Sequence, residues 1–437
     1  MIKKIGLTVL MTAVLVAGVF ASGQQEKKAA EDSQEEVVLK VAYPVAVDAP
    51  VADILNGYAT EFKKTHPNVT IEPVYAGGYT DVKTMIQTSI DGGGDAPELA
   101  VMLATDVYDL ANAQYIEPLS DLLANMEGSD AYLDDFLPVF LENSYYQDKL
   151  WSLPFQRSAV VAYYNADLFK AAGLSEPKNL QELADAAQAL TVREGDSVTR
   201  WGIEWPTGWP YWVFQPLAMA FGKNIVGADD TTVYFNEPEV IDAINYYNDL
   251  SAKYQATPAG VQGTWGNVVP NFLSGNTAII VQTSGSLSKI LSNADFEVGV
   301  MGIPGKTSGS YSVPGGGNIY MTSGLSDAEK RAALDFAVFM TSPENAAQFS
   351  IATGYIATSK SAFSSDAMKA YSAEHPQVAK IKDILADAGK ELAIQNLGQV
   401  RSIFHNYIQA AFNGEMTAAE AMAKAQEEAD AALADFK

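Results

Sequence analysis

The sequence predicts an α/β protein made of two lobes. Its 437 residues exceed one small module and suffice for two substantial hydrophobic cores. Short β-branched runs alternate with segments of helical periodicity in the first part of the chain, and this order favours a mainly parallel sheet with helices on both faces. A second unit of the same kind begins after 151–155. We therefore expect the chain to cross between the lobes more than once.

Strand and helix steps alternate at the start of the first lobe. Apolar runs indicate strands at 37–42, 69–74 and 99–103, and helical spacing indicates helices at 51–64 and 80–90. A glycine break at 92–94 follows the second helix. It lacks the Gly-Lys-Ser/Thr ending of a phosphate-binding loop, so it is more typical of a helix end.

The second unit repeats this alternation. Strands are expected at 159–164 and 277–282, and helices at 180–190 and 237–254. Several helix starts carry a capping pair, in which two side chains satisfy the first free N–H groups. These pairs are Ser326 with Glu329, Thr417 with Glu420, and Asn236 with Glu239 around Pro238.

Composition excludes several classes of protein. Lys and Arg number 28 and Asp and Glu 53, so the formal net charge is −25. A chain this acidic is a poor partner for nucleic acid or an anionic membrane, and we expect neither. There is no Cys and there are only three His. Disulfides and thiolate metal sites are thereby excluded, and we expect no metal and no cofactor.

Residues 1–21 are predicted to be a cleaved secretory signal peptide. Lys3 and Lys4 precede an apolar run at 5–20, which is shorter than the roughly 20 residues of a spanning helix. Small residues suited to a cleavage site follow, ending at Ala21. The polar segment 22–36 is expected to be a disordered leader. Without a cysteine, a lipid anchor on that residue type cannot form, so we expect an exported soluble protein.

Aromatic residues concentrate in one short segment. Four of the six Trp residues lie between 201 and 212, interrupted by Pro and Gly, so they cannot all share one helical core face. Indole rings stack on sugar rings and flank pockets. We expect Trp205, Trp209 and Trp212 to flank a ligand; an aromatic plug at a domain edge is the alternative.

Two further features are compatible with ligand binding. The run Gly315–Gly317 either leaves backbone N–H groups free for a ligand oxygen or forms a tight turn or bulge between two strands. Arg401 is predicted in the first turn of a helix, where the helix dipole disfavours a cation by about 0.3–1 kcal/mol. An anionic ligand would reverse that cost, and a surface salt bridge is the alternative.

Catalysis has little support in the residues. The sequence contains no HExxH, GxSxG or Walker signature. Paired carboxylates for glycoside hydrolysis depend on spatial separation, which the sequence leaves open. A secreted glycoside or phosphoester hydrolase is therefore kept as the alternative function.

Several motifs in this order resemble family 1 extracellular solute-binding proteins of bacterial ABC importers. They are the segments 62–69 (FKKTHPNV), 95–101 (DAPELAV), 151–155 (WSLPF), 163–165 (YYN), 272–278 (FLSGNTA), 342–346 (SPENA), 353–355 (TGY) and 412–414 (FNG). The resemblance implies a two-lobed periplasmic-binding-protein fold of type II, with the ligand cleft between the lobes. It implies a first lobe of 37–155 plus 278–323 and a second of 156–277 plus 324–437.

The closest likeness is to the glycerol-3-phosphate-binding branch, and binding positions carry over one at a time. They are Tyr79, Ser158 or its neighbour Arg157, Ser284 or Ser286, Gly316 in the segment that continues to Gly317, Tyr355, and Arg401 as the phosphate-holding arginine. Leu103 departs from the pattern, because the resemblance implies an acidic residue there that meets a ligand hydroxyl. A sugar or a related phosphodiester therefore remains open as the ligand.

The resemblance implies capture by closure. A sugar, polyol or glycerol phosphate would be held between the lobes in the periplasm and passed to the ABC permease subunits, without catalysis. We expect the binding protein to be a monomer.

Overall fold

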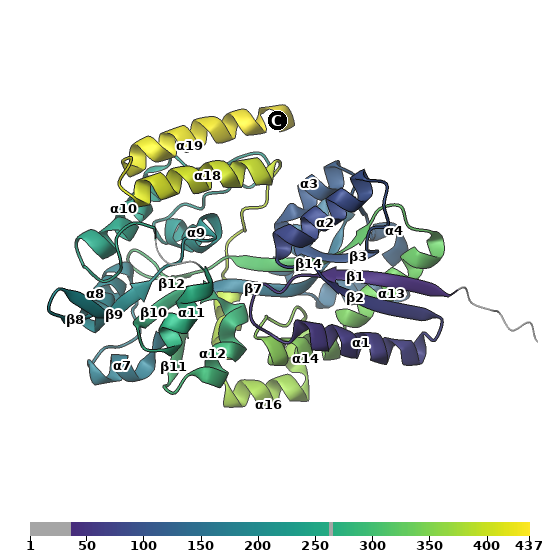
Figure 1. The fold of residues 1–437 in the computed structure, drawn as a ribbon, viewed down its shortest axis with the longest axis horizontal. Coiled ribbons are helices and arrows are strands. Elements are labelled where there is room, and N and C mark those ends of the chain that lie inside the picture. Colours follow the sequence, from purple (N-terminus) through teal and green to yellow (C-terminus); the bar gives the residue numbers. More distant parts are fainter. Residues whose placement is uncertain (1–35, 262–264) are drawn as a thin grey trace, which may run out of the picture. The chain divides into compact units, whose positions relative to one another are not determined.

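A computed structural model of the protein describes residues 36–261 and 265–437. The predicted signal peptide at 1–21 and all but the last residue of the predicted leader lie outside the described residues. Residues Glu36–Lys437 form one compact unit (Figure 1).

A twisted sheet runs through this unit. In the described residues it has ten strands, eight of them in the order β2-β1-β3-β14-β7-β10-β9-β8, with β4 on β14 and β11 on β7. The strands are β1 (Val37–Tyr43), β2 (Val69–Tyr75), β3 (Leu99–Leu103), β4 (Ile116–Glu117), β7 (Ser152–Asn165), β8 (Val192–Glu194), β9 (Ser197–Glu204), β10 (Thr277–Thr283), β11 (Val298–Met301) and β14 (Pro314–Thr322). Two small hairpins pair β5 (Tyr145–Tyr146) with β6 (Lys149–Leu150) and β12 (Ile303–Pro304) with β13 (Ser310–Tyr311).

Helices cover the sheet at both ends (Figure 1). Those before β9 are α1 (Val51–Thr65), α2 (Tyr79–Asp91), α3 (Val107–Asn112), α4 (Ser120–Leu123), α5 (Ser129–Asp135), α6 (Pro138–Leu141), α7 (Ala166–Ala171) and α8 (Leu180–Leu190). Then come α9 (Pro210–Ala220), α10 (Pro238–Ala252), α11 (Trp265–Leu273), α12 (Leu287–Asn293), α13 (Asp327–Met340), α14 (Pro343–Thr353), α15 (Lys360–Ser364), α16 (Asp366–Glu374), α17 (Pro376–Ala386), α18 (Leu397–Phe412) and α19 (Ala418–Leu433). Short 3₁₀ turns are η1 (Ala104–Asp106), η2 (Glu142–Ser144), η3 (Ser284–Ser286) and η4 (Ala434–Phe436).

Two long strands, β7 and β14, carry the chain between the two ends of the sheet. The first half of β7 pairs with β14, and its second half pairs with β10 and β11. β14 in turn pairs with β3, which lies beside β1 in the parallel part of the sheet. The two strands thus connect the two halves of the sheet along their length.

The buried side chains gather into separate clusters on either side of these strands. One pair of clusters is built from α1, α2, β1 and β3, and includes α13 and, from α14, Phe349, whereas Ala346 and Ala347 of α14 belong to the other pair. Another pair is built from α8 to α12 with β10, and includes α17 to α19. α13 packs against β1, whereas β10 lies between β7 and β9. The predicted lobe boundaries stay a prediction.

Most predicted elements are found within a residue or two, because their periodicity or caps are strong. Ser326 and Thr417 cap α13 and α19 as expected, each with its Glu at the third helical position. The predicted pair Asn236 and Glu239 is wrong: Glu237 is the N-cap of α10, and no side chain caps it. Pro238 does occupy the first turn.

Two other expectations need correction. The run Gly315–Gly317 lies inside the single strand β14 rather than between two strands, with an irregularity in the pairing to β7 between Gly317 and Asn318. Helix α18 begins at Leu397, so Arg401 lies in its second turn rather than its first. There the dipole penalty is weaker, since the effect falls off within the first turn.

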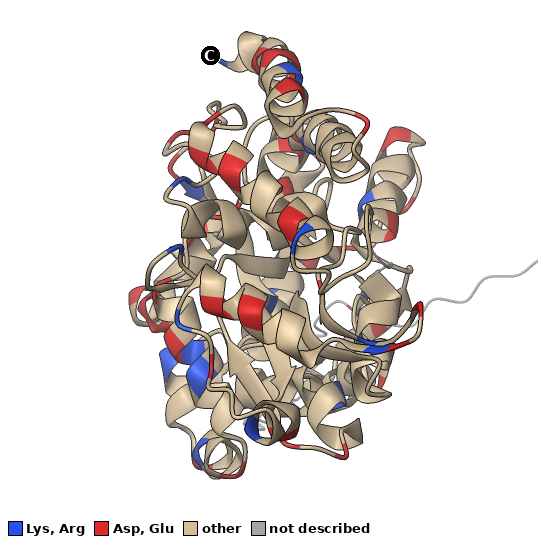
Figure 2. Ribbon diagram, turned by 90° about the vertical axis from the view of Figure 1, so that its left-hand side faces the viewer, with Lys and Arg blue, Asp and Glu red and all other residues tan. Residues whose placement is uncertain are grey.

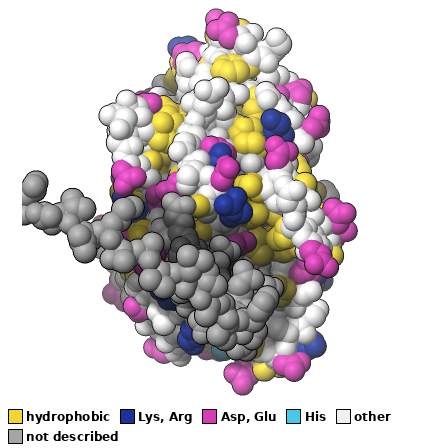
Figure 3. Space-filling model, turned by 90° about the vertical axis from the view of Figure 1, so that its right-hand side faces the viewer, with side chains coloured by type: hydrophobic (Ala, Val, Ile, Leu, Met, Phe, Trp, Pro, Cys, Tyr) yellow, Lys and Arg dark blue, Asp and Glu magenta, His cyan; other side chains and the backbone are white. Residues whose placement is uncertain are grey.

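Acidic residues are spread over many helices rather than gathered on one (Figure 2). On the face shown in Figure 3 they alternate with apolar and uncharged side chains. Among the described residues, no helix combines the length and apolar character needed to cross a membrane.

Candidate functional site

A cavity of about 160 Å³ opens where the two halves of the sheet meet. Six aromatic side chains line it: Tyr79, Trp209, Tyr211, Trp212, Trp265 and Tyr355. They come from α2, from α9 and the residue before it, from α11, and from the segment after α14. Because these elements belong to both groups of buried clusters, the cavity forms only when the two groups are together.

Tyr79 is the first residue of α2 and depends on the turn before it. Gly77 has φ +101°, and Asp81 accepts a hydrogen bond from the Gly78 N–H at 2.7 Å, which fixes the helix start. The Tyr79 ring is 7% exposed, and its hydroxyl has no hydrogen-bond partner among the described residues. An unpaired buried hydroxyl is costly, so this group is available to a ligand.

The glycine run of β14 makes room for the aromatic walls. A Cβ on Gly315 would lie 2.4 Å from the Trp212 ring, and one on Gly317 would lie 2.6 Å from the Tyr79 ring. Gly316 has φ +92°, and a Cβ there would lie 2.1 Å from the Gln156 carbonyl oxygen. These glycines serve close packing of the rings and the neighbouring strand.

Hydrogen bonds and ring contacts fix the indoles. The Trp212 indole N–H donates to the Pro314 carbonyl at 2.8 Å. Its ring centroid lies 5.9 Å from that of Trp265, and the rings of Trp209 and Tyr211 meet edge to face at 6.2 Å. The aromatic walls are therefore held in place before any ligand arrives.

Few polar groups face the cavity. Ser158 and Thr283 line it, and the Tyr355 hydroxyl accepts a hydrogen bond from Gln156 Nε2 at 2.9 Å. Leu103, at the end of β3, adds an apolar side chain where the resemblance implies an acid. Glu391 contributes a carboxylate from the connector 387–396 between α17 and α18.

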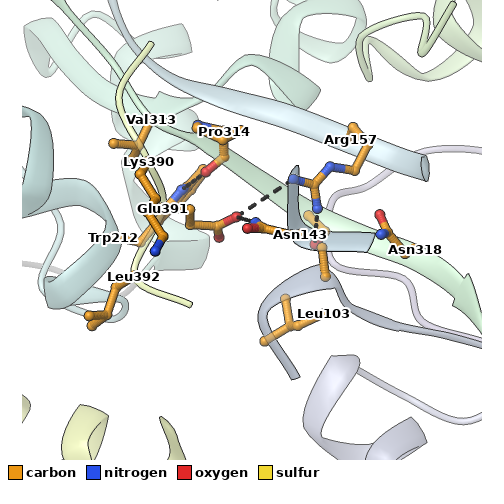
Figure 4. A network of polar contacts seen from close by, with 12 residues as sticks. Leu103, Asn143, Arg157, Trp212, Val313, Pro314, Asn318, Lys390, Glu391 and Leu392 are labelled. Carbon is orange, nitrogen blue, oxygen red and sulfur yellow. Dashed lines mark hydrogen bonds and ion pairs between the residues drawn. The ribbon is translucent and has the colours of Figure 1, made fainter. Parts of the chain in front are cut away.

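Glu391 belongs to a buried network with Arg157 and Asn143 (Figure 4). Its Oε2 accepts a hydrogen bond from Asn143 Nδ2 at 2.9 Å and lies 3.6 Å from Arg157 Nη2, an ion pair too long for a hydrogen bond. Burial raises the pKa of the Glu391 carboxyl to about 8, against the opposing effect of Arg157. Arg157 Nη1 donates to the Gly316 carbonyl at 3.1 Å.

Arg401 lies outside the cavity, behind Trp209 and Tyr211. Its guanidinium carbon is 5.6 Å from the centroid of each ring. It lines a separate surface groove of about 240 Å³, whose walls also include Trp209 and Tyr211. Arg401 Nη1 is buried and has no hydrogen-bond partner among the described residues.

The structure thus brings together part of the predicted set. The cavity is lined by six of the predicted residues: Tyr79, Ser158, Trp209, Trp212, Gly316 and Tyr355. Arg157 and Gly317 lie directly behind it.

The other predicted residues lie elsewhere. Trp205 is in the core, where its indole N–H donates to the Val213 carbonyl at 3.0 Å. Ser284 and Ser286 are buried in η3, and Ser284 Oγ accepts from the Ala159 N–H at 3.0 Å.

Sequence reasoning missed several lining residues. Tyr211 was within the aromatic segment, whereas Trp265 stands alone at a helix start and had no pattern to mark it. Glu391 had one weak signal, a charged residue directly before the apolar run 392–394. A charge beside a buried segment needs a partner, and here the partners lie far away in the sequence.

A family model described as bacterial extracellular solute-binding protein matches residues 57–377. This chain belongs to that family. Members of the family bind small solutes for ABC importers, and the fold has two lobes. The hydrolase alternative has no support among the relatives.

Curated relatives and solved structures agree with this assignment. The sn-glycerol-3-phosphate-binding periplasmic protein UgpB of Pectobacterium atrosepticum is 26% identical over 408 residues, covering 88% of this solute-binding protein and 88% of that one. UgpB of Escherichia coli is 24% identical, covering 92% and 94%. The structure of UgpB from Mycobacterium tuberculosis in complex with glycerophosphocholine has a TM-score of 0.78 at 21% identity, covering 90% and 98%. Maltose-bound MalE3 of T. maritima has a TM-score of 0.78 at 20% identity, covering 90% and 99%.

Proposed function

We propose that this protein captures one small organic solute in the aromatic cavity and passes it, chemically unchanged, to the membrane subunits of its importer. The observation that carries the proposal is that residues from both halves of the sheet line one and the same cavity. A ligand that contacts both halves stabilises their closed arrangement, which is the signal a permease can recognise. The solute is of the sugar, polyol or glycerol-phosphate type bound by the relatives.

The ligand contacts we propose follow from the lining. Tyr79, Tyr355, Ser158 and the Gly316 backbone supply polar contacts, and the rings of Trp209 and Trp212 stack on the ligand. Arg157, Gly317, Trp205, Ser284 and Ser286 support these groups from behind. Arg401 contacts a ligand only where that ligand extends past Trp209 and Tyr211 into the outer groove.

The side chains that line the cavity are consistent with binding and release of a ligand that stays chemically unchanged. None of the three histidines, at 66, 375 and 405, is among the described residues that line the cavity, so Ser158 has no histidine base there. The protein acts in the periplasm as a monomer after removal of its signal peptide.

A thermal-shift panel tests the proposal. A ligand at about 100 times its Kd adds roughly 2.7 kcal/mol to the free energy of unfolding, which raises the melting temperature measurably. Maltose, glycerol, glycerol 3-phosphate and glycerophosphocholine form the panel, with chemical analysis of each after incubation. We expect one class to raise the melting temperature and to be recovered intact.

A pair of tryptophan variants locates the binding. Trp212→Ala removes a wall of the cavity and should abolish the shift. Trp201→Ala removes an indole of β9 that stacks with Arg193 away from the cavity, so its shift should persist. Turnover of a panel compound, or a shift that survives Trp212→Ala and is lost in Trp201→Ala, would contradict the proposal.

A further inference from the structure

Glu391 presents one carboxylate oxygen to the cavity. The side chain is 3% exposed, and Oε2 is occupied by Asn143 and Arg157. Oε1 receives no hydrogen bond from any described residue, although the side chain lines the cavity. A carboxylate oxygen at the wall of a cavity, without a donor from the protein, is a strong acceptor for an incoming group.

The positive partner of this carboxylate is hidden from the cavity. Arg157 is 0% exposed, donates to the Gly316 carbonyl and stacks at 5.2 Å over the Phe140 ring. Among the described residues that line the cavity, Glu391 is the only Asp, Glu, Lys or Arg. A ligand therefore meets the Glu391 carboxyl group and not a guanidinium, so an anionic ligand group finds no opposite charge beside Glu391.

The other walls of the cavity also favour a positively charged ligand group. The faces of aromatic rings carry partial negative charge and attract cations, most strongly where water is excluded. Six aromatic residues line the space. Its volume of about 160 Å³ is close to that of an engineered cavity that holds one benzene molecule, so a compact head group can fill it.

With Leu103 at the end of β3, the acidic group of this cavity is supplied by Glu391. The resemblance implies an acid at this position, facing a ligand hydroxyl, and Leu103 offers only methyl groups to the cavity. The connector 387–396 instead brings Glu391 to the same cavity from the other end of the chain.

We propose that Glu391 is the specificity-determining residue of this cavity and that it selects a ligand whose buried end is an organic ammonium group. The inference rests on the proposed capture function and adds the chemistry of the ligand. Glu391 Oε1 supplies the negative charge, and the rings of Trp212 and Trp265 surround the methyl or methylene groups on the nitrogen. Any phosphate on the ligand then extends toward Arg401.

Choline and its neutral isostere 3,3-dimethylbutan-1-ol test the charge directly, because they have the same shape. Isothermal titration of the full mature protein should give at least tenfold tighter binding of choline. Glu391→Gln keeps the shape of the side chain and should remove this preference while leaving binding of the neutral isostere. Equal affinity of the wild-type protein for both compounds, or an undiminished preference in Glu391→Gln, would overturn the proposal.

Proton release provides a readout that needs no variant. A bound cation favours the ionised carboxyl, so binding lowers the raised pKa of Glu391 and releases protons at pH 7. Choline affinity should rise with pH until about pH 8. The groups that act on Glu391 are Arg157 from β7, Asp106 from η1, and the phenols of Tyr79, Tyr211 and Tyr320.

The result separates this proposal from the capture function. A thermal shift with maltose or glycerol 3-phosphate, but none with choline or glycerophosphocholine, supports capture and rejects the ammonium group. Titration of choline in buffers of different ionisation enthalpy that reveals no proton release also rejects it. A panel in which no compound shifts the melting temperature rejects both.

Discussion

At the residue scale, Gly315 sets how closely Trp212 approaches β14. The Trp212 indole donates to the Pro314 carbonyl, directly beside the place where a Cβ on Gly315 would meet the ring. A ring held this close cannot move aside without breaking that hydrogen bond. The position of the aromatic wall therefore depends on the absence of one methyl group.

Gly315→Ala should displace Trp212 and weaken ligand binding. The overlap at 2.4 Å is with a ring packed against Trp265, so we expect a loss of about 1–3 kcal/mol of stability as well. Urea unfolding and ligand titration measure the two effects. Gly57→Ala is the matched control, since nothing lies within 4 Å of its Cβ and it sits inside α1. It should leave binding unchanged and raise stability slightly; similar binding by the two variants would contradict this role of Gly315.

At the element scale, periodic segments could be predicted from the sequence and the connector could not. Helices at 51–64 and 180–190 repeat apolar residues at helical spacing, and the structure has them as α1 and α8. The connector 387–396 has no repeating pattern, because its residues are buried by contacts with distant elements. Glu391 was missed for this reason, whereas Tyr79 and Tyr355 lay in recognisable motifs. Local sequence predicts elements better than it predicts which loop reaches a cavity.

Helix α9 holds the connector in place through Gln215. Its Nε2 donates to the Lys390 carbonyl at 2.7 Å, and its Oε1 accepts from the Leu392 N–H at 3.3 Å, on both sides of Glu391. Gln215→Ala should lower stability by about 1–3 kcal/mol and weaken ligand binding, since it leaves buried backbone groups unpaired and frees Glu391 to move. The control is Gln188→Ala in α8, which removes a hydrogen bond from the Gln188 side chain to the Tyr254 carbonyl. Unfolding and titration should reveal a stability loss in both variants and a binding loss in Gln215→Ala alone; a binding loss in both would count against the positioning role.

At the scale of the whole molecule, the buried clusters suggest how the chain divides. We propose that α13 moves with β1 to β3, and that β10 moves with β7 and β9, because each packs in the corresponding cluster, whereas α14 contributes buried residues to clusters on both sides. The boundaries predicted from the sequence assigned 278–323 and 324–437 differently, since crossings cannot be counted from strand order alone. On this division, the two halves close about β7 and β14, which connect them. Polar contacts that join the halves elsewhere stabilise the closed arrangement.

One of these contacts should control closure. Asn112 Nδ2 donates to Gln395 Oε1 at 2.7 Å, which joins α3 to the connector. Asn112→Ala removes a bond that exists only while the halves are together, so ligand affinity should fall about three- to tenfold, through faster dissociation, for a loss of about 0.5–1.5 kcal/mol. Asn125→Ala is the control, because the Asn125 side chain donates to the Asp121 carbonyl within its own turn at 2.8 Å.

Stopped-flow fluorescence of the cavity tryptophans gives the dissociation rates of the two variants. Small-angle scattering should give a smaller radius of gyration on ligand binding in both variants. An unchanged dissociation rate in Asn112→Ala would mean that the contact forms independently of closure.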